Sequence, residues 1–344
     1  MPSPFLSRRR VLGGLAALGA TAVSANPRFT AAQDRQKVSI ALDWYPNANH
    51  AGLYLAQERG YFSEAGLEVE LYTPSDPTVV LQTVGAGRDD FGISYQTDVL
   101  LARAEKVPVV SVAALVQHPL MGVMALESSG IERPADLVGT TVGYPGIPSQ
   151  EAFLTTMLTN DGASIEDISL INVDFNLVPA LISGQTDAVM GAYWTHETIL
   201  AEQEGYPVTM LRVEEWGVPD YYELVMVASE EKIASSPEQI SALLGAIERG
   251  YLDAIADPDA AIAAMKQAYP ELDEQVEQLG IGLLAGVWLD PEGRYGAQSA
   301  ERWSAYAAWM KQAELIPADL NELTAFDSTL LPLATPAASP VAGP

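Results

Sequence analysis

The chain has 344 residues, of which 48% are hydrophobic, and its 45 acidic and 18 basic residues give a formal net charge of −27. This negative balance argues against a nucleic-acid partner and against an anionic membrane surface. The sequence contains no cysteine, which excludes disulfides, thiolate metal sites and a cysteine nucleophile. The length exceeds that of one typical domain, so we expect two lobes.

The N-terminal segment has the features of an export signal. Residues 7–25 read SRRRVLGGLAALGATAVSA, in which three arginines precede an apolar run that ends in small residues. The arginine pair followed by Val11 and Leu12 resembles a Tat signal. The apolar run is shorter than the roughly 20 residues that span a bilayer. We therefore expect residues 1–36 to be signal and linker, with export to the periplasm or the outer face of the cell membrane; a retained amphipathic anchor is the alternative.

From Lys37 onward, short β-rich runs alternate with helical patterns, which is typical of a largely parallel sheet flanked by helices. The first set of expected strands covers residues 38–44, 67–73, 89–94 and 107–115. The expected helices between them cover residues 51–62, 78–87 and 97–106.

A second set of the same kind follows residues 121–126. Its expected helices cover residues 134–139, 149–162 and 178–185, and its expected strands cover residues 141–145, 169–175 and 187–194. Residues 222–229 add another buried strand, and beyond Ser235 the hydrophobic spacing is helical. The Pro/Ala-rich residues 331–344 are expected to form a flexible tail.

One local pattern occurs in both sets. A helix ends at Gly87 or Gly184, and an aspartate three residues later, Asp90 or Asp187, opens a hydrophobic strand. Glycine relieves the left-handed backbone at a helix C-terminus, and aspartate can tie the following turn. The repetition suggests two lobes of similar plan, although a local solution used twice would look the same.

Aromatic, amide and acidic side chains gather where the predicted strands end. Ligands of open α/β sheets bind beyond the carboxyl ends of the strands, so these residues are candidates for one pocket. Aromatic faces could hold a flat ring, because offset stacking adds about 0.5 to 1.5 kcal/mol beyond area burial. Carboxylates and amides at the ring edge would select a nitrogen-bearing heteroaromatic. The segments are residues 43–50, 94–96, 144–149, 193–197 and 220–222.

Other chemistries lack their motifs. His50, His118 and His196 do not have metal-ligand spacing. The sequence shows neither a phosphate-binding glycine loop nor a nucleophile elbow. We therefore expect no catalytic residue, no metal and no cofactor.

Four segments resemble the ThiY-like substrate-binding proteins of ABC importers, a family grouped with the fungal thiamine-pyrimidine synthase. They read LDWYPNANHAGLYLAQERGYFSEAGLEVEL, DDFGISYQTDVLLARAEKVPVVSVAAL, DAVMGAYWTHE and GVPDYYELVMVAS. The resemblance implies the periplasmic-binding-protein type II fold, in which two α/β lobes enclose a ligand cleft. The implied division is residues 37–125 plus 226–330 for lobe 1 and residues 126–225 for lobe 2.

The synthase branch of this group carries a Lys, a His and a cysteine-rich segment. Here the Lys and His positions fall on Ser94 and Asp98, and the cysteine segment reads VPDYYELV. The resemblance therefore implies a binding protein and not an enzyme. A sensor module attached to a receptor is a further alternative, but the length leaves no room for a fused signalling domain.

In the importer branch the implied ligand is a thiamine pyrimidine precursor of the formylaminopyrimidine type. The resemblance implies that Trp44 and Tyr222 stack on the ring, that Asn47 contributes an amide contact, and that Tyr193 and Glu197 meet the polar edge. Their location at strand ends adds four further ligand-binding candidates: His50, Tyr95, Ser149 and Tyr221.

A related branch, the RibY-like proteins, is thought to bind riboflavin, and this alternative stays open. Anions are disfavoured because the candidate segments contain no Arg or Lys. As partners we expect an ABC permease and a separate ATPase subunit, and we expect the protein itself to be a monomer. Closure would use hinges near residues 123–127 and 223–228.

Overall fold

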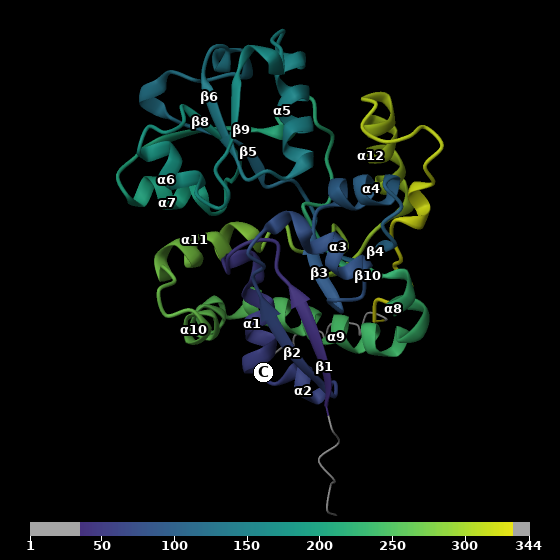
Figure 1. Cartoon of the computed structure of the whole chain (residues 1–344). Helices are drawn as coiled ribbons and strands as arrows, with labels where there is room; N and C mark the ends of the chain where they lie inside the picture. Colours follow the sequence, from purple (N-terminus) through teal and green to yellow (C-terminus); the bar gives the residue numbers. More distant parts are fainter. Residues whose placement is uncertain (1–34, 333–344) are drawn as a thin grey trace, which may run out of the picture. The chain divides into compact units, whose positions relative to one another are not determined.

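The computed structural model describes residues 35–332, so the predicted export signal and nearly all of the predicted tail lie outside the described residues. The described residues belong to one compact unit and contain two five-stranded mixed sheets with helices packed on them (Figure 1). The predicted α/β class is confirmed. Within residues 35–332, no helix is both long and apolar enough to cross a membrane.

The first sheet has the strand order β2-β1-β3-β10-β4. β1 pairs in parallel with β2 and β3, whereas β10 is antiparallel to both β3 and β4. β3, β4 and β10 are buried along their whole length, which explains their nearly continuous hydrophobic sequences. The strands are β1 (Gln36–Ala41), β2 (Leu67–Tyr72), β3 (Phe91–Ser94), β4 (Val109–Val116) and β10 (Leu224–Ser229).

The second sheet repeats this plan in the order β7-β6-β8-β5-β9. β6 is parallel to β7 and β8, and β5 is antiparallel to β8 and β9. The sequence analysis missed β9, an edge strand that is mostly half-buried and directly follows Pro207. The strands are β5 (Met121–Leu126), β6 (Thr141–Tyr144), β7 (Ser169–Asn172), β8 (Ala188–Tyr193) and β9 (Val208–Arg212).

The repeated glycine and aspartate pattern makes the same contact in both sheets. Gly87 and Gly184 have φ angles of 66° and 72°, in the left-handed region that glycine adopts readily. Asp90 accepts a hydrogen bond from the backbone N–H of Ser39, and Asp187 accepts one from Thr141, at 3.1 and 2.8 Å. Each aspartate thus ties the start of one strand to its parallel neighbour, which supports the interpretation of two similar lobes.

The helices cover the sheets and continue after β10 into a helical C-terminal region. α1 packs against α9 and α10 in the first lobe, and α6 packs against β8 and α7 in the second (Figure 1). The helix expected over residues 134–139 is a short 3-10 turn, Pro134–Leu137. The helices are α1 (Ala51–Glu58), α2 (Tyr61–Glu64), α3 (Val80–Gly85), α4 (Gln96–Ala104), α5 (Pro148–Asn160), α6 (Leu177–Ile182), α7 (Glu197–Gln203), α8 (Glu230–Ser235), α9 (Pro237–Ala256), α10 (Pro258–Ala268), α11 (Glu274–Leu284) and α12 (Ala300–Gln312).

The chain crosses between the sheets twice, through residues 117–120 and residues 213–223. The hinges expected at residues 123–127 and 223–228 lie mostly inside β5 and β10. Each of these strands is paired in its sheet, so neither is free to act as a hinge. A hinge between the two sheets would have to lie in the two crossing segments. β5 lies in the second sheet, earlier than the predicted start of lobe 2 at residue 126. The exact lobe boundaries stay a prediction.

Candidate functional site

A small cavity lies at the carboxyl ends of strands from both sheets, where the fold predicts a ligand site. Its side chains leave room for about one water molecule, so the walls stand close together. The lining residues are Asp43, Trp44, Asn47, Tyr95, Gln150, Gly191, Tyr193 and Glu197.

Five of the nine predicted site residues line this cavity: Trp44, Asn47, Tyr95, Tyr193 and Glu197. The structure places the other four in the layer behind it. His50 and Ser149 are fully buried, and Tyr221 and Tyr222 are 1% exposed, each held by contacts described below.

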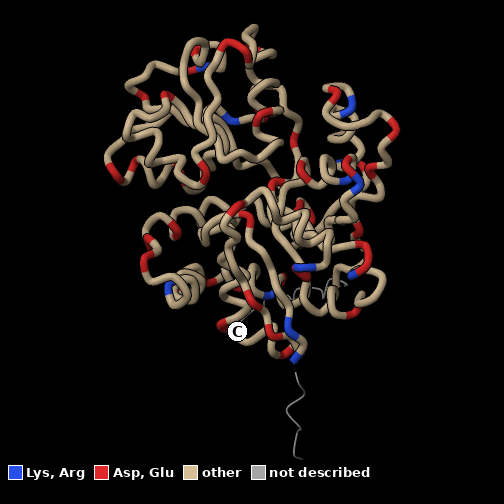
Figure 2. Tube along the Cα trace, viewed as in Figure 1, with Lys and Arg blue, Asp and Glu red and all other residues tan. Residues whose placement is uncertain are grey.

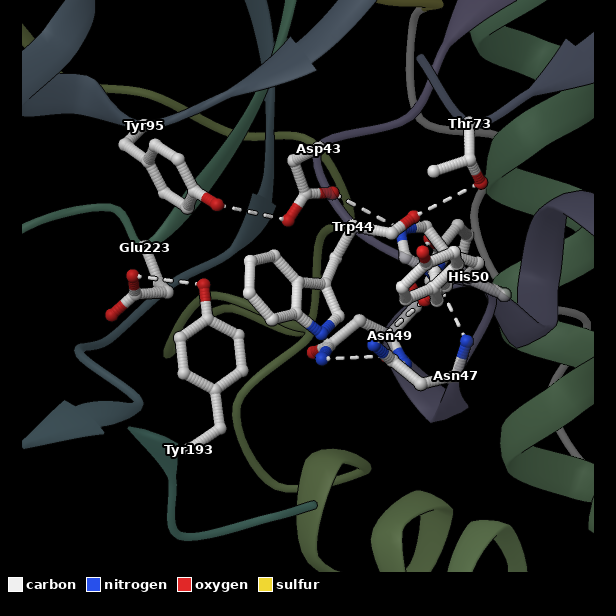
Figure 3. Close-up of polar contacts among 11 residues, drawn as sticks. Asp43, Trp44, Asn47, Asn49, His50, Thr73, Tyr95, Tyr193 and Glu223 are labelled. Atoms are coloured by element: carbon white, nitrogen blue, oxygen red, sulfur yellow. Dashed lines mark hydrogen bonds and ion pairs between the residues drawn. The ribbon is translucent and has the colours of Figure 1, made fainter. Parts of the chain in front are cut away.

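Asp43 anchors the wall that follows β1. Its side chain is 3% exposed and accepts a hydrogen bond from the Tyr95 hydroxyl at 3.2 Å (Figure 3). The backbone N–H of Asn47 donates to Nδ1 of His50, so Nε2 is the ring nitrogen that carries the proton and donates to Asp43 at 3.0 Å. His50 therefore positions Asp43 from behind and does not reach the cavity.

The side-chain amide of Asn47 forms hydrogen bonds within its own loop. Its Oδ1 accepts hydrogen bonds from the backbone and the side chain of Asn49, both at 2.9 Å, and its Nδ2 donates to the carbonyl oxygen of Tyr45. The same side chain caps the 3-10 turn Ala48–His50. Asn47 lines the cavity, and the amide contact that the resemblance implied stays a prediction, since Nδ2 carries a second N–H that none of these bonds uses.

Trp44 projects from the β1 loop toward the second lobe. Figure 3 shows its indole between the Tyr193 ring and the loop that carries Asn47 and Asn49. Phe175, from the loop after β7, contacts the indole edge at 4.5 Å and the Tyr45 ring at 4.4 Å between centroids. An aromatic side chain of the second lobe is thus held against two of the first, beside the cavity.

Glu197 supplies a carboxylate at the opposite wall. It is 7% exposed and opens α7, where a helix N-terminus favours negative charge. Its Oε2 accepts a hydrogen bond from the backbone N–H of Tyr193 at 2.8 Å. One oxygen is therefore fixed by the protein.

Glu223 joins the two crossing segments behind this wall. Its fully buried carboxyl accepts hydrogen bonds from the Leu120 backbone N–H at 2.6 Å, from the Tyr221 hydroxyl at 2.9 Å and from the Tyr193 hydroxyl at 3.1 Å. Burial raises the pKa of Glu223 to about 7, against the lowering effect of these hydrogen bonds. Tyr193 therefore connects the cavity to the two crossing segments.

Asp98 makes the corresponding contact on the other side. The Ser149 hydroxyl, from the first turn of α5 in the second lobe, donates to Asp98 on α4 in the first lobe at 2.7 Å. Burial raises the pKa of Asp98 to about 6, although this hydrogen bond opposes the shift. Ser149 thus links the two lobes and lies outside the cavity.

Stability should decrease with pH because of these two carboxyls. In the unfolded chain Asp and Glu titrate near pH 4, so between pH about 4 and about 7 the folded protein binds more protons than the unfolded chain. The free energy of unfolding then falls as the pH rises through this window. We expect the Tm to decline from pH 5 to pH 7, and Glu223→Gln to make this decline shallower.

Differential scanning calorimetry at several pH values between 5 and 7.5 measures this slope. Glu58→Gln, at an exposed position of α1, is the matched control and should keep the wild-type slope. A Glu223→Gln protein with the slope of the wild type would contradict the proposed burial effect.

Tyr221 and Tyr222 have structural partners. Tyr221 packs against Phe153 and Tyr306, with ring centroids 5.3 and 5.2 Å away. The Tyr222 hydroxyl accepts a hydrogen bond from the Ser299 backbone N–H at 2.9 Å. The Arg302 guanidinium covers the Tyr222 ring at 4.0 Å, so that face is not available for the ring stacking that the resemblance implied.

The two lobes also meet along α11. A Cβ atom added to Gly280 would lie 2.8 Å from Cβ of Ala48 in the first lobe and 2.9 Å from the carbonyl oxygen of Thr195 in the second. Only a residue without a side chain allows this approach. Nearby, Nδ1 of His196 lies 3.6 Å from a carboxylate oxygen of Glu277, also on α11.

Sequence reasoning missed three residues that line or flank the cavity: Gln150, Gly191 and Phe175. For Gly191 a signal existed, because an isolated glycine within a predicted strand indicates a bulge. For Gln150 and Phe175 the sequence offers no comparable signal, since neither belongs to a motif. Asp43 stood within a candidate segment, but its role depends on partners at positions 50 and 95.

Comparisons with known proteins identify relatives of this chain. Residues 47–261 match a family model described as NMT1/THI5 like. The chain is 38% identical to the formylaminopyrimidine-binding protein of Halalkalibacterium halodurans, over 87% of this chain and 92% of that protein. It is 30% identical to the 4-amino-5-hydroxymethyl-2-methylpyrimidine phosphate synthase of Schizosaccharomyces pombe, over 64% of this chain and 66% of the synthase.

Among solved structures, the alkanesulfonate-binding protein SsuA of Xanthomonas axonopodis pv. citri, bound to MOPS, is similar with a TM-score of 0.69. The match covers 86% of this chain and 99% of that protein at 17% sequence identity. At this identity the likeness concerns the fold alone. It confirms the predicted periplasmic-binding-protein type II fold.

Proposed function

Because the chain belongs to the NMT1/THI5-like family, we propose that it is the solute-binding protein of an ABC importer and that it captures a formylaminopyrimidine for uptake. The observation that carries this proposal is the similarity to the formylaminopyrimidine-binding protein of Halalkalibacterium halodurans, which extends over most of both chains. The cavity chemistry supports it independently.

The lining residues suit a flat, donor-bearing ring. Trp44 and Tyr193 offer aromatic faces from opposite lobes, and Glu197 offers a carboxylate to an exocyclic amine. None of the eight lining residues that the structure describes is Lys or Arg, and acidic residues are spread over the helices and loops of both lobes (Figure 2). A sulfonate, nitrate or phosphate would find no positive partner in this cavity.

The walls of the cavity stand close together and leave room for about one water molecule. Entry of a substituted pyrimidine or of riboflavin therefore requires the walls to part. Rotation about the two crossing segments, residues 117–120 and 213–223, would provide this movement.

The site binds its ligand without changing it chemically. The positions that carry Lys and His in the synthase branch are Ser94 and Asp98, and Asp98 is occupied by its bond to Ser149. The chain is exported, and its partners are a membrane permease and a separate ATPase subunit. The net charge of −27 favours solubility.

A ligand panel tests the proposal. The purified protein is incubated with formylaminopyrimidine, thiamine or riboflavin, and the thermal midpoint is followed. A ligand at 100 times its Kd should stabilise the protein by about 2.7 kcal/mol. Formylaminopyrimidine should give the largest shift, whereas a shift with riboflavin alone, or a preparation that emerges yellow, would overturn the pyrimidine assignment.

A further inference from the structure

Gln150 lies in the first turn of α5, and its side chain lines the cavity while being 2% exposed. Within residues 35–332, its carbonyl oxygen Oε1 has no hydrogen-bond partner. Buried amide oxygens are nearly always paired, because an unpaired one has lost its water without a replacement. An orphaned acceptor in a cavity wall therefore calls for a specific explanation.

The backbone opposite Gln150 is shaped to receive it. In the pairing of β5 with β8, Gly122 faces Ala192 and Val123 faces Met190, so Gly191 is an inserted residue, a β-bulge. Its φ angle is 98°, which side-chain-bearing residues rarely adopt. A Cβ atom at position 191 would lie 2.6 Å from Nε2 and 2.7 Å from Oε1 of Gln150. The bulge thus makes room for this amide at the cavity wall.

Gln96 shows what a structural glutamine looks like in the same protein. It is also fully buried, and its Oε1 accepts a hydrogen bond from the Tyr222 backbone N–H at 2.8 Å, although its Nε2 has no partner within residues 35–332. The acceptor oxygen of Gln96 therefore serves the fold. The side-chain carbonyl of Gln150 has no hydrogen-bond partner within the described residues, although the bulge at Gly191 leaves room for the amide.

We propose that Gln150 is a specificity-determining residue, whose Oε1 accepts a hydrogen bond from an N–H group of the bound heteroaromatic. This inference rests on the proposed function. Gln150 and Glu197 line the same cavity, so a ligand would meet two acceptors, one neutral and one acidic. Together they favour a ring that carries at least two N–H donors and disfavour a ring whose edge bears only acceptors.

Gln150→Met and Gln96→Met form a matched pair of tests, because methionine has a similar length and no hydrogen-bonding amide. Titration calorimetry with formylaminopyrimidine should show about a tenfold or greater loss of affinity for Gln150→Met. Gln96→Met should stay within about threefold of the wild type. Wild-type affinity in Gln150→Met would overturn the inference.

Thermal unfolding without ligand gives a second, independent readout. Gln150→Met should unfold at the wild-type temperature or above, because the substitution removes an unpaired buried acceptor. Gln96→Met should unfold at a lower temperature, because it leaves the Tyr222 backbone N–H without a hydrogen-bond acceptor. A lower midpoint for Gln150→Met would mean that its amide is structural, and this result would overturn the inference. Because this measurement uses no ligand, it tests the inference even if the wild type binds no pyrimidine and the proposed function fails.

Discussion

Replacing Trp44 by alanine is expected to weaken formylaminopyrimidine binding by about 2 to 4 kcal/mol, the range of a large aromatic side chain at the centre of a binding surface. The indole lines the cavity from the first lobe and lies across from the Tyr193 ring of the second. Alanine would remove both the stacking face and the apolar area that the ligand covers. The loss also frees Phe175 from its edge contact with the indole.

Titration calorimetry measures this loss, and Trp309→Ala is its matched control. Trp309 is half-buried on α12 and belongs neither to the cavity wall nor to a crossing segment, so its removal should leave the affinity within about threefold. Trp44→Phe should recover part of the binding because a smaller ring can still stack. Trp44→Ala with nearly wild-type affinity would place the ligand elsewhere.

Glu197→Gln should weaken formylaminopyrimidine by about 1.5 to 3 kcal/mol, the contribution of a hydrogen bond to a charged group. The substitution keeps an oxygen that can accept the Tyr193 backbone N–H, so the start of α7 should stay intact. What disappears is the negative charge that pairs with an exocyclic amine. The affinity for riboflavin, if measurable, should change much less.

Glu202→Gln provides the control, since Glu202 is exposed on the same helix and carries the same charge. Both variants should unfold near the wild-type temperature. If Glu197→Gln kept the wild-type affinity for the pyrimidine, the proposed role of the Glu197 carboxylate in recognition would be wrong. The proposed stacking contribution of Trp44 would not be affected.

Much of the cavity could be predicted from the sequence because of a general property of parallel sheets. The carboxyl ends of neighbouring strands in one sheet converge, so residues that follow β1 and β3 were expected to meet. The residues after β8, in the second sheet, were expected to join them because the family resemblance implied a ligand cleft between two lobes. Trp44, Tyr95, Tyr193 and Glu197 do line one cavity. The two-lobe plan followed from the alternation of strand and helix patterns, and the glycine and aspartate repeat indicated the similarity of the lobes.

The remaining features depend on contacts between distant positions. Tyr222 faces the scaffold because it contacts Ser299 and Arg302, which lie about 80 residues later in the chain. No local sequence pattern indicates these contacts. The bulge at Gly191 is defined by its register against β5, which the sequence of β8 alone does not contain. His50 lies at the right strand end, but its ring turns inward to hold Asp43.

The contact at Gly280 affects the affinity of this protein for a ligand, but it does not affect the selectivity between ligands. α11 approaches the second lobe at Thr195, and neither Gly280 nor Thr195 lines the cavity. Any free energy gained there adds equally for every ligand that allows the lobes to meet. Two proteins with identical cavity walls could therefore rank their ligands identically and still differ many-fold in affinity, through this one helix.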